Sequence, residues 1–161
     1  MERCVVNASP LICLAKAGFS DFLLKLPDEI IVPNAVNEEI QAGRSGDPAR
    51  AELASGKFPT TEISADPAIL SWDLGKGETA VLSYALSNPG WTAIIDDQAA
   101  RKCARSFSIP LKGTLAVVIL AKKQGLIPSA VDAMRSLQEA GLRVDEEVIR
   151  IALKQTVGEN W

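Results

Sequence analysis

Short β-branched runs alternate with longer stretches of helical character along this chain, and that alternation constrains the fold more than any other feature. The clearest runs lie at 3–6, 29–32 and 92–95, with shorter ones at 60–63 and 109–111. Strands separated by helical segments pair in parallel through right-handed crossovers. We therefore predict one α/β domain over residues 1–161, with a mostly parallel central sheet flanked by helices. We expect this sheet to contain Val5, Val6, Ile31, Ile94 and Ile95.

Capping residues and helix-ending glycines mark the helical segments between these runs. We expect Ser9 and Pro10 to open a first helix that ends near Gly18, and Ser20 to cap a second that ends at Leu26. Further helices are expected from Asn34 onward and over 48–56, 79–86, 98–107, 114–125, 128–140 and 145–156. In the segment 128–140, Val131, Met134 and Leu137 form an apolar stripe that we assign to the core.

Composition narrows the class of protein. Only 5% of the 161 residues are aromatic, so aliphatic side chains must build the core. No apolar run reaches the roughly 18 residues of a membrane helix, and the N-terminus does not resemble a signal peptide. We expect a cytoplasmic protein without membrane contact. Cys4, Cys13 and Cys103 share no paired spacing and are expected to be buried free thiols.

The chain contains no histidine and has a net charge of −3. The absence of histidine excludes Ser-His-Asp triads, histidine-based zinc sites and histidine acid–base chemistry. The negative charge argues against a basic coat for nucleic acid, which needs clustered Lys and Arg. A local patch remains, because Arg101, Lys102 and Arg105 cluster in one segment. Any nucleic acid is therefore expected to meet a small site.

Acidic or carboxamide side chains recur where predicted strands end or helices begin. They are Asn7, Glu39, Glu78 and the adjacent Asp96 and Asp97. Ligands of open parallel sheets bind beyond the carboxyl ends of the strands. Carboxylates gathered there repel one another unless a cation lies among them, and Mg²⁺ or Mn²⁺ favours oxygen ligands. The pattern predicts metal-assisted phosphodiester chemistry.

Each of these residues also has a structural alternative. Glu78 is a favourable first-turn charge of a helix, Asp97 a helix N-cap and Asn7 a turn residue. Glu39 and the adjacent Glu38 lie on different faces of one helix, so only one of them turns inward. Glu39 lies three residues past the apolar Val36 and is the better candidate, and its structural alternative is a solvated surface charge.

Five segments together carry a resemblance that each alone would not. They are VVNASPLI (5–12), VPNAVNEEI (32–40), GKGETA (75–80), IIDDQAARKCA (94–104) and KGTLAV (112–117). In this order and spacing they resemble the PIN-domain family of metal-dependent ribonucleases, from Val5 to about Leu142. The branch they resemble most contains the VapC-type toxins of toxin–antitoxin pairs.

The resemblance implies a three-layer PIN-like fold and a catalytic set of Asn7, Glu39, Glu78 and Asp97. These residues and Asp96 would ligate Mg²⁺ or Mn²⁺, and Ser9 and Arg101 would contact the substrate. Lys112 and Thr114 lie in a turn shared with that branch. Asn7 departs from the family pattern, which has an aspartate there. A carboxamide supplies an oxygen but no charge, so metal affinity and activity are expected to fall.

The leading hypothesis is therefore an Mg²⁺- or Mn²⁺-dependent endoribonuclease of toxin type, with RNA as substrate. The resemblance also implies a small antitoxin protein and a homodimer as partners. One alternative is a catalytically weakened PIN-like module that binds RNA or protein, which Asn7 favours. Another is a phosphate-accepting receiver-like domain, which ranks last because its acidic pair would follow the first strand. For Arg101, a solvated helix face is the alternative to an RNA contact.

Overall fold

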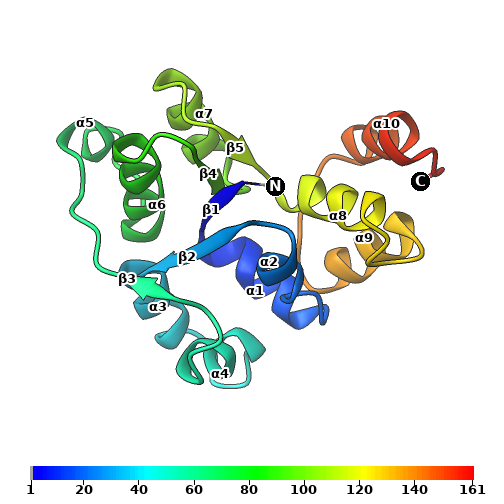
Figure 1. Cartoon of the computed structure of the whole chain (residues 1–161), viewed down its shortest axis with the longest axis horizontal. Helices are drawn as coiled ribbons and strands as arrows, with labels where there is room; N and C mark the ends of the chain where they lie inside the picture. The colour runs from blue at the N-terminus through cyan, green and yellow to red at the C-terminus, as the bar shows by residue number, and fades with distance from the viewer. Residues whose placement is uncertain (1) are drawn as a thin grey trace.

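A five-stranded parallel sheet forms the centre of the protein (Figure 1), in a computed structural model that describes residues 2–161. The strand order is β3-β2-β1-β4-β5, and every neighbouring pair is parallel. The strands are Arg3–Val6 (β1), Glu29–Pro33 (β2), Thr60–Thr61 (β3), Trp91–Ile94 (β4) and Leu111–Lys112 (β5). The predicted α/β class with a parallel sheet is confirmed.

Helices make up most of the rest of the chain. They are Ala8–Lys16 (α1), Phe22–Lys25 (α2), Asn34–Gln41 (α3), Pro48–Ala54 (α4), Pro67–Leu70 (α5), Lys76–Ser87 (α6), Gln98–Ser106 (α7), Thr114–Lys123 (α8), Ala130–Glu139 (α9) and Glu146–Val157 (α10). Figure 1 shows α5 and α6 on one side of the sheet and α1, α2 and α8 on the other. Helix α3 contacts both α1 and α6 and so links the two helical layers.

Several helix starts differ from the predicted ones, among them that of α9, which begins at Ala130 and not at Pro128. Helix α1 begins at Ala8 with Asn7 as N-cap, so Ser9 is an exposed residue of the first turn and not the cap. Asp21, not Ser20, occupies the N-cap position of α2. Helix α6 begins at Lys76, which places Glu78 in its first turn. Strand β1 leads directly into α1. The backbone N–H of Asn7, the N-cap of α1, still donates a sheet hydrogen bond to Ile94 O at 3.0 Å.

The predicted strands were displaced at their ends. Of the five residues predicted for the sheet, four lie in strands: Val5, Val6, Ile31 and Ile94. Ile95 lies just past the end of β4, although its backbone N–H donates to Lys112 O at 2.9 Å. The run predicted at 109–111 pairs only at Leu111–Lys112. The Ile109 amide instead closes the end of α7 by bonding to Ala104 O, after Ser108 turns the chain with φ +54°. The short helix α5 was not predicted.

The core is aliphatic, as expected from composition. Met134 and Leu137 of the predicted stripe are fully buried, and Val131 packs against the core from a half-buried position. The three cysteines are free and buried, which confirms that prediction. Burial raises the pKa of the Cys4 thiol to about 11. Among residues 2–161, none of the helices combines the length and apolarity that crossing a bilayer requires.

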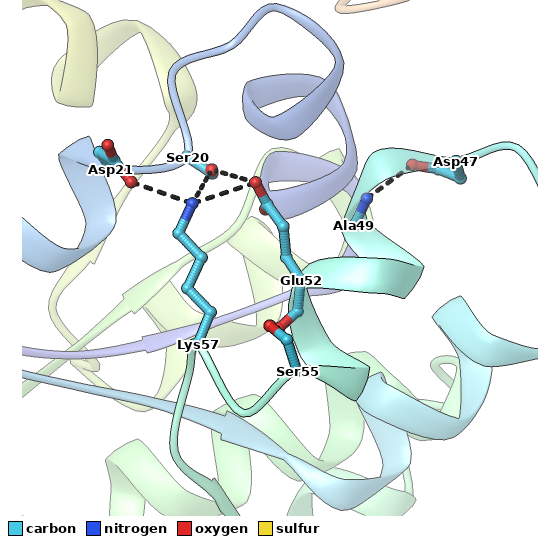
Figure 2. Close-up of polar contacts among 7 residues, drawn as sticks. All are labelled: Ser20, Asp21, Asp47, Ala49, Glu52, Ser55 and Lys57. Carbon is cyan, nitrogen blue, oxygen red and sulfur yellow. Dashed lines mark hydrogen bonds and ion pairs between the residues drawn. The ribbon is translucent and has the colours of Figure 1, made fainter.

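A cluster of polar side chains, here called the Lys57 network, joins the segment before α2 to α4 (Figure 2). Lys57 Nζ lies 2.9 Å from Asp21 Oδ1, 3.0 Å from Glu52 Oε1 and 2.9 Å from Ser20 Oγ. The Ser20 hydroxyl donates in turn to Glu52 Oε1 at 2.8 Å. Ser20 therefore serves this network rather than capping a helix. Two carboxylates are here held around one ammonium group.

Candidate metal and active site

Asn7 lies at the carboxyl end of the central strand β1 and is only 2% exposed. Its Nδ2 faces Glu78 Oε1 across 3.5 Å, at the limit of a hydrogen bond. Its Oδ1 is buried and accepts no hydrogen bond from any residue within 2–161. A buried carbonyl oxygen without a donor costs about 1–3 kcal/mol. That oxygen therefore needs a partner, which a bound cation or its water would supply.

Glu39 is an exposed residue of α3, but its Oε1 is turned toward the same point. A Cβ atom placed on Gly77 would lie 3.2 Å from Glu39 Oε1 and 3.3 Å from Asn7 Oδ1. The two oxygens thus converge on the bare Cα of Gly77, and any larger residue would press on both. Gly77 is a residue of this site that the sequence prediction did not single out. A glycine inside a helix with no turn to make is itself a signal of close packing.

Glu78 follows Gly77 in the first turn of α6 and supplies the second carboxylate. The pKa of Glu39 is raised, first because burial disfavours its charged form and second because Glu78 repels that charge. The carboxylates of Glu39 and Glu78 therefore repel each other, although Glu39 lies in α3 and Glu78 in α6. We call Asn7, Glu39 and Glu78 the Asn7 cluster.

Asp96 and Asp97 follow β4, the strand beside β1, and both bind helix starts. Asp97 Oδ2 accepts from the Ala100 amide at 2.9 Å and caps α7, as its structural alternative predicted. Asp96 uses both oxygens on Thr114, taking its amide at 2.9 Å and its hydroxyl at 2.6 Å. Thr114 is fully buried and has this structural role at the start of α8.

The two predicted substrate contacts lie in different settings. Ser9 is exposed on the first turn of α1, and its side chain makes no hydrogen bond to residues 2–161. Arg101 is half-buried, with Nη1 donating to Ile95 O at 3.0 Å, so its guanidinium is partly withdrawn from solvent. Burial and the neighbouring Arg105 lower the pKa of Arg101, while Asp96 opposes them.

The donors of the Asn7 cluster fit a hard divalent cation. They are two carboxylates and one carboxamide, all oxygen ligands, and Mg²⁺ is commonly held by one or two carboxylates while it keeps several waters. Across residues 2–161, no three Asp, Glu, Cys or His side chains are grouped to hold an ion. The fold thus brings Asn7, Glu39 and Glu78 together. Asp96 and Asp97 instead accept hydrogen bonds at the starts of α8 and α7.

Comparison with known proteins agrees with this class of α/β domain bearing acids at the carboxyl edge of the sheet. A family model described as a PIN domain matches residues 3–158, nearly the whole chain. The protein belongs to the PIN-domain family. Membership supports a nuclease-type, hydrolytic function, and PIN domains typically use divalent metals. No curated protein matches the chain.

Proposed function

We propose that this protein is an Mg²⁺- or Mn²⁺-dependent endoribonuclease related to the toxins of type II toxin–antitoxin pairs. The observation that carries the proposal is the Asn7 cluster, in which the buried Asn7 side chain has an unpartnered Oδ1 beside Glu39 and turns its Nδ2 to Glu78, two carboxylates from different helices. Such a group of oxygens without a positive partner is what a divalent cation completes.

Glu39, Glu78 and Asn7 Oδ1 would hold the cation. Asp97, at the neighbouring strand end with its Oδ2 capping α7, would complete the catalytic set through its other carboxylate oxygen. Asp96 supports the set through Thr114. A bound divalent ion lowers the pKa of its water and offsets charge on the phosphate. Ser9 and Arg101 are the proposed substrate contacts, Arg101 being fixed toward the strand end by its bond to Ile95 O.

A cleavage assay on RNA with Mg²⁺ or Mn²⁺ titrated from zero tests the proposal. Glu39→Gln and Glu78→Gln keep side-chain size but remove charge, so both are expected to abolish divalent-dependent cleavage. Glu38→Gln is the matched control, because Glu38 adjoins Glu39 on the same helix, is likewise exposed, and lies outside the cluster. Cleavage that persists in EDTA, or that survives both cluster substitutions, would contradict the proposal.

A second candidate function is a PIN-like module that binds RNA or protein without cutting. Asn7 favours it, because the cluster has two formal charges where three carboxylates would bind a cation more strongly. Calorimetric titration with Mn²⁺ separates the two. The nuclease proposal requires that Mn²⁺ binds through Glu39 and Glu78. RNA binding that is unaffected by Mn²⁺ and by Glu78→Gln would instead support the binding module.

The partners we propose are RNA, a small antitoxin protein and a second copy of this chain. Support for a homodimer is apolar surface near the later helices: Ile151 on α10 is 47% exposed, and Leu126, between α8 and α9, is 37% exposed. Sedimentation equilibrium at high micromolar concentration is expected to give a dimer mass. A monomer across that range would refute self-association.

A further inference from the structure

Helix α10 is weakly docked for its length. Of its 12 residues only Ile149 and Leu153 are buried, whereas α6, which is equally long, buries Val81, Leu82 and several of their neighbours. The main contacts of α10 are with α8 and α9, and Figure 1 shows it at the edge of the molecule, away from the sheet. Elements that bury little apolar surface open at a lower free energy than the core does.

The segment that follows α10, residues 158–161, turns back and binds α9; we call it the strap. Gly158 ends α10 in a left-handed conformation with φ +69°. The Glu159 carboxylate then meets the start of α9. It accepts from the amides of Ala130 and Val131 at 2.9 and 3.0 Å and from the Ser129 hydroxyl at 3.1 Å. The strap thus supplies acceptors for backbone donors that have no partner inside their own helix.

The contact between Glu159 and α9 favours the ionised carboxylate. Burial by itself raises the pKa of Glu159, but the hydrogen bonds from the start of α9 outweigh it, and the pKa is lowered. Lys122 at the end of α8 adds a positive charge, with its Nζ 3.9 Å from Glu159 Oε2. One carboxylate therefore joins the end of α8, the start of α9 and the segment after α10.

Trp161 holds the far end of the strap between α9 and α10. Its indole N–H donates to Glu146 in the first turn of α10, and the Arg135 guanidinium of α9 lies 4.6 Å from the ring centroid. A cation at this distance is attracted to the face of an indole ring. Glu146 also accepts from Gln138 of α9 at 3.1 Å. The strap and its contacts therefore hold α10 against α9 at both ends of the helix.

A short hinge, residues 143–145, joins α10 to the preceding chain without helix or strand. The chain is fixed as far as Leu142, which is buried and whose amide donates to Leu137 O at 2.9 Å. A few loop residues of this kind can absorb the backbone changes of a moving element. Helix α10 can therefore move as a unit once the strap is released.

Helix α10 also forms one wall of a groove of about 480 Å³ beside Asp96. Val148 and Ala152 line this wall, and α7 and α8 contribute the rest. We propose that α10 is a lid on this groove, that it opens about the hinge, and that the strap holds it closed. Opening widens the groove and exposes Ile149 and Leu153. It requires neither RNA nor metal, so it does not depend on the proposed nuclease function.

Thiol labelling of the whole chain tests the lid. Ile149→Cys places a thiol on the buried face of α10, where N-ethylmaleimide reacts with it only when α10 opens. Cys4 in β1 is fully buried and reports global unfolding of the same molecules. Labelling of the introduced thiol, located by mass spectrometry, is expected to be at least about tenfold faster than labelling of Cys4. Val81→Cys in α6 is the positional control and is expected to label at the rate of Cys4.

A second substitution in the Ile149→Cys chain tests the strap. Glu159→Gln removes the charge that α9 binds and is expected to speed labelling of the introduced thiol at least about tenfold, because charge-assisted hydrogen bonds are lost from the closed state alone. Labelling of Cys4 is expected to rise by no more than the same factor. Glu139→Gln removes the same charge from an exposed position of α9 outside the strap and is expected to change neither rate.

Hydrogen exchange of the chain without introduced cysteines gives the same comparison should Ile149→Cys fail to fold. Amides of α10 are expected to exchange faster than those of α6, and faster still in Glu159→Gln. Equal rates in α10 and α6, or labelling of the introduced thiol no faster than that of Cys4, would mean that α10 leaves only on global unfolding. Those results, or an unchanged opening rate in Glu159→Gln, would overturn the proposal.

Discussion

The Lys57 network and the Asn7 cluster each gather two carboxylates from separate segments, yet they are opposites in charge balance. In the first, Lys57 Nζ lies 2.9 Å from Asp21 and 3.0 Å from Glu52. In the second, Glu39 and Glu78 have only a neutral carboxamide between them. One group contains its own cation, and the other has no positive side chain to hold it together.

The pKa directions express the same difference. The hydrogen bond and charge of Lys57 lower the pKa of Asp21. Burial and then Glu78 raise the pKa of Glu39. An unpartnered oxygen alone does not distinguish the two, because Glu52 Oε2 and Asn7 Oδ1 both lack a hydrogen bond within residues 2–161. What distinguishes them is the missing positive charge, and this makes the Asn7 cluster the better candidate for a metal.

The largest expected effect comes from Asp97, the proposed fourth catalytic residue. Asp97→Asn is expected to reduce divalent-dependent RNA cleavage about a hundredfold or more, because a metal site supplies several kcal/mol of charge stabilisation. Asparagine caps a helix as well as aspartate does, so α7 stays intact and only charge is lost. Asp66→Asn, the same change at the cap of α5, is the control. Full activity in Asp97→Asn would remove this residue from the site.

A second prediction breaks the Lys57 network. Lys57→Met is expected to lower the free energy of unfolding by about 2 kcal/mol, because Glu52 and Ser20 lose a charge-assisted partner. Lys25→Met, an exposed lysine on α2, is expected to change it little. Urea denaturation measures both. If Mn²⁺ restored the stability lost in Lys57→Met, the Lys57 network could also bind a metal ion. That result would contradict the contrast drawn here between the Lys57 network and the Asn7 cluster.

A third prediction completes the Asn7 cluster. Asn7→Asp is expected to tighten Mn²⁺ binding about tenfold, or 1.4 kcal/mol, and to raise cleavage, because it restores a third carboxylate. Without metal the same variant is expected to be less stable than wild type, since a further buried negative charge joins two others. Calorimetry and thermal unfolding with and without Mn²⁺ measure the two changes. An unchanged Mn²⁺ affinity in Asn7→Asp would show that residue 7 does not ligate the metal.

The smallest effect concerns pH. Because the folded-state pKa of Glu39 is raised, its ionised form destabilises the native state above that pKa, and the penalty is relieved as pH falls through it. Metal binding needs the ionised form. The stabilisation by Mn²⁺, about 1 kcal/mol at several times its Kd, is therefore expected above the folded pKa of Glu39 and lost as pH falls through it. Thermal unfolding across pH checks this, with Glu38→Gln as control.

Local features of the chain were predictable where a segment determines its own conformation. The strand Arg3–Val6 was predicted with its observed bounds, and Asp47 and Asp97 cap helices as their positions indicate. Errors occurred where a neighbour decided the outcome. Ser20 resembles a cap, but Glu52 and Lys57 recruit its hydroxyl. The helix predicted over 79–86 begins three residues earlier, at Lys76 with Gly75 as its N-cap, and Gly77 in its first turn lies against α3.

The sequence by itself determined the α/β class, the aliphatic core and the residue types of the site, because periodicity, caps and the lack of histidine are properties of short segments and composition. Tertiary structure alone decided which acids meet. Asp96 is taken by Thr114, 18 residues away, while Glu39 and Asn7 converge on Gly77. Parallel crossovers bring strand ends and helix starts together from distant positions, and whether a carboxylate there meets a hydroxyl, an ammonium or another carboxylate depends on packing between layers.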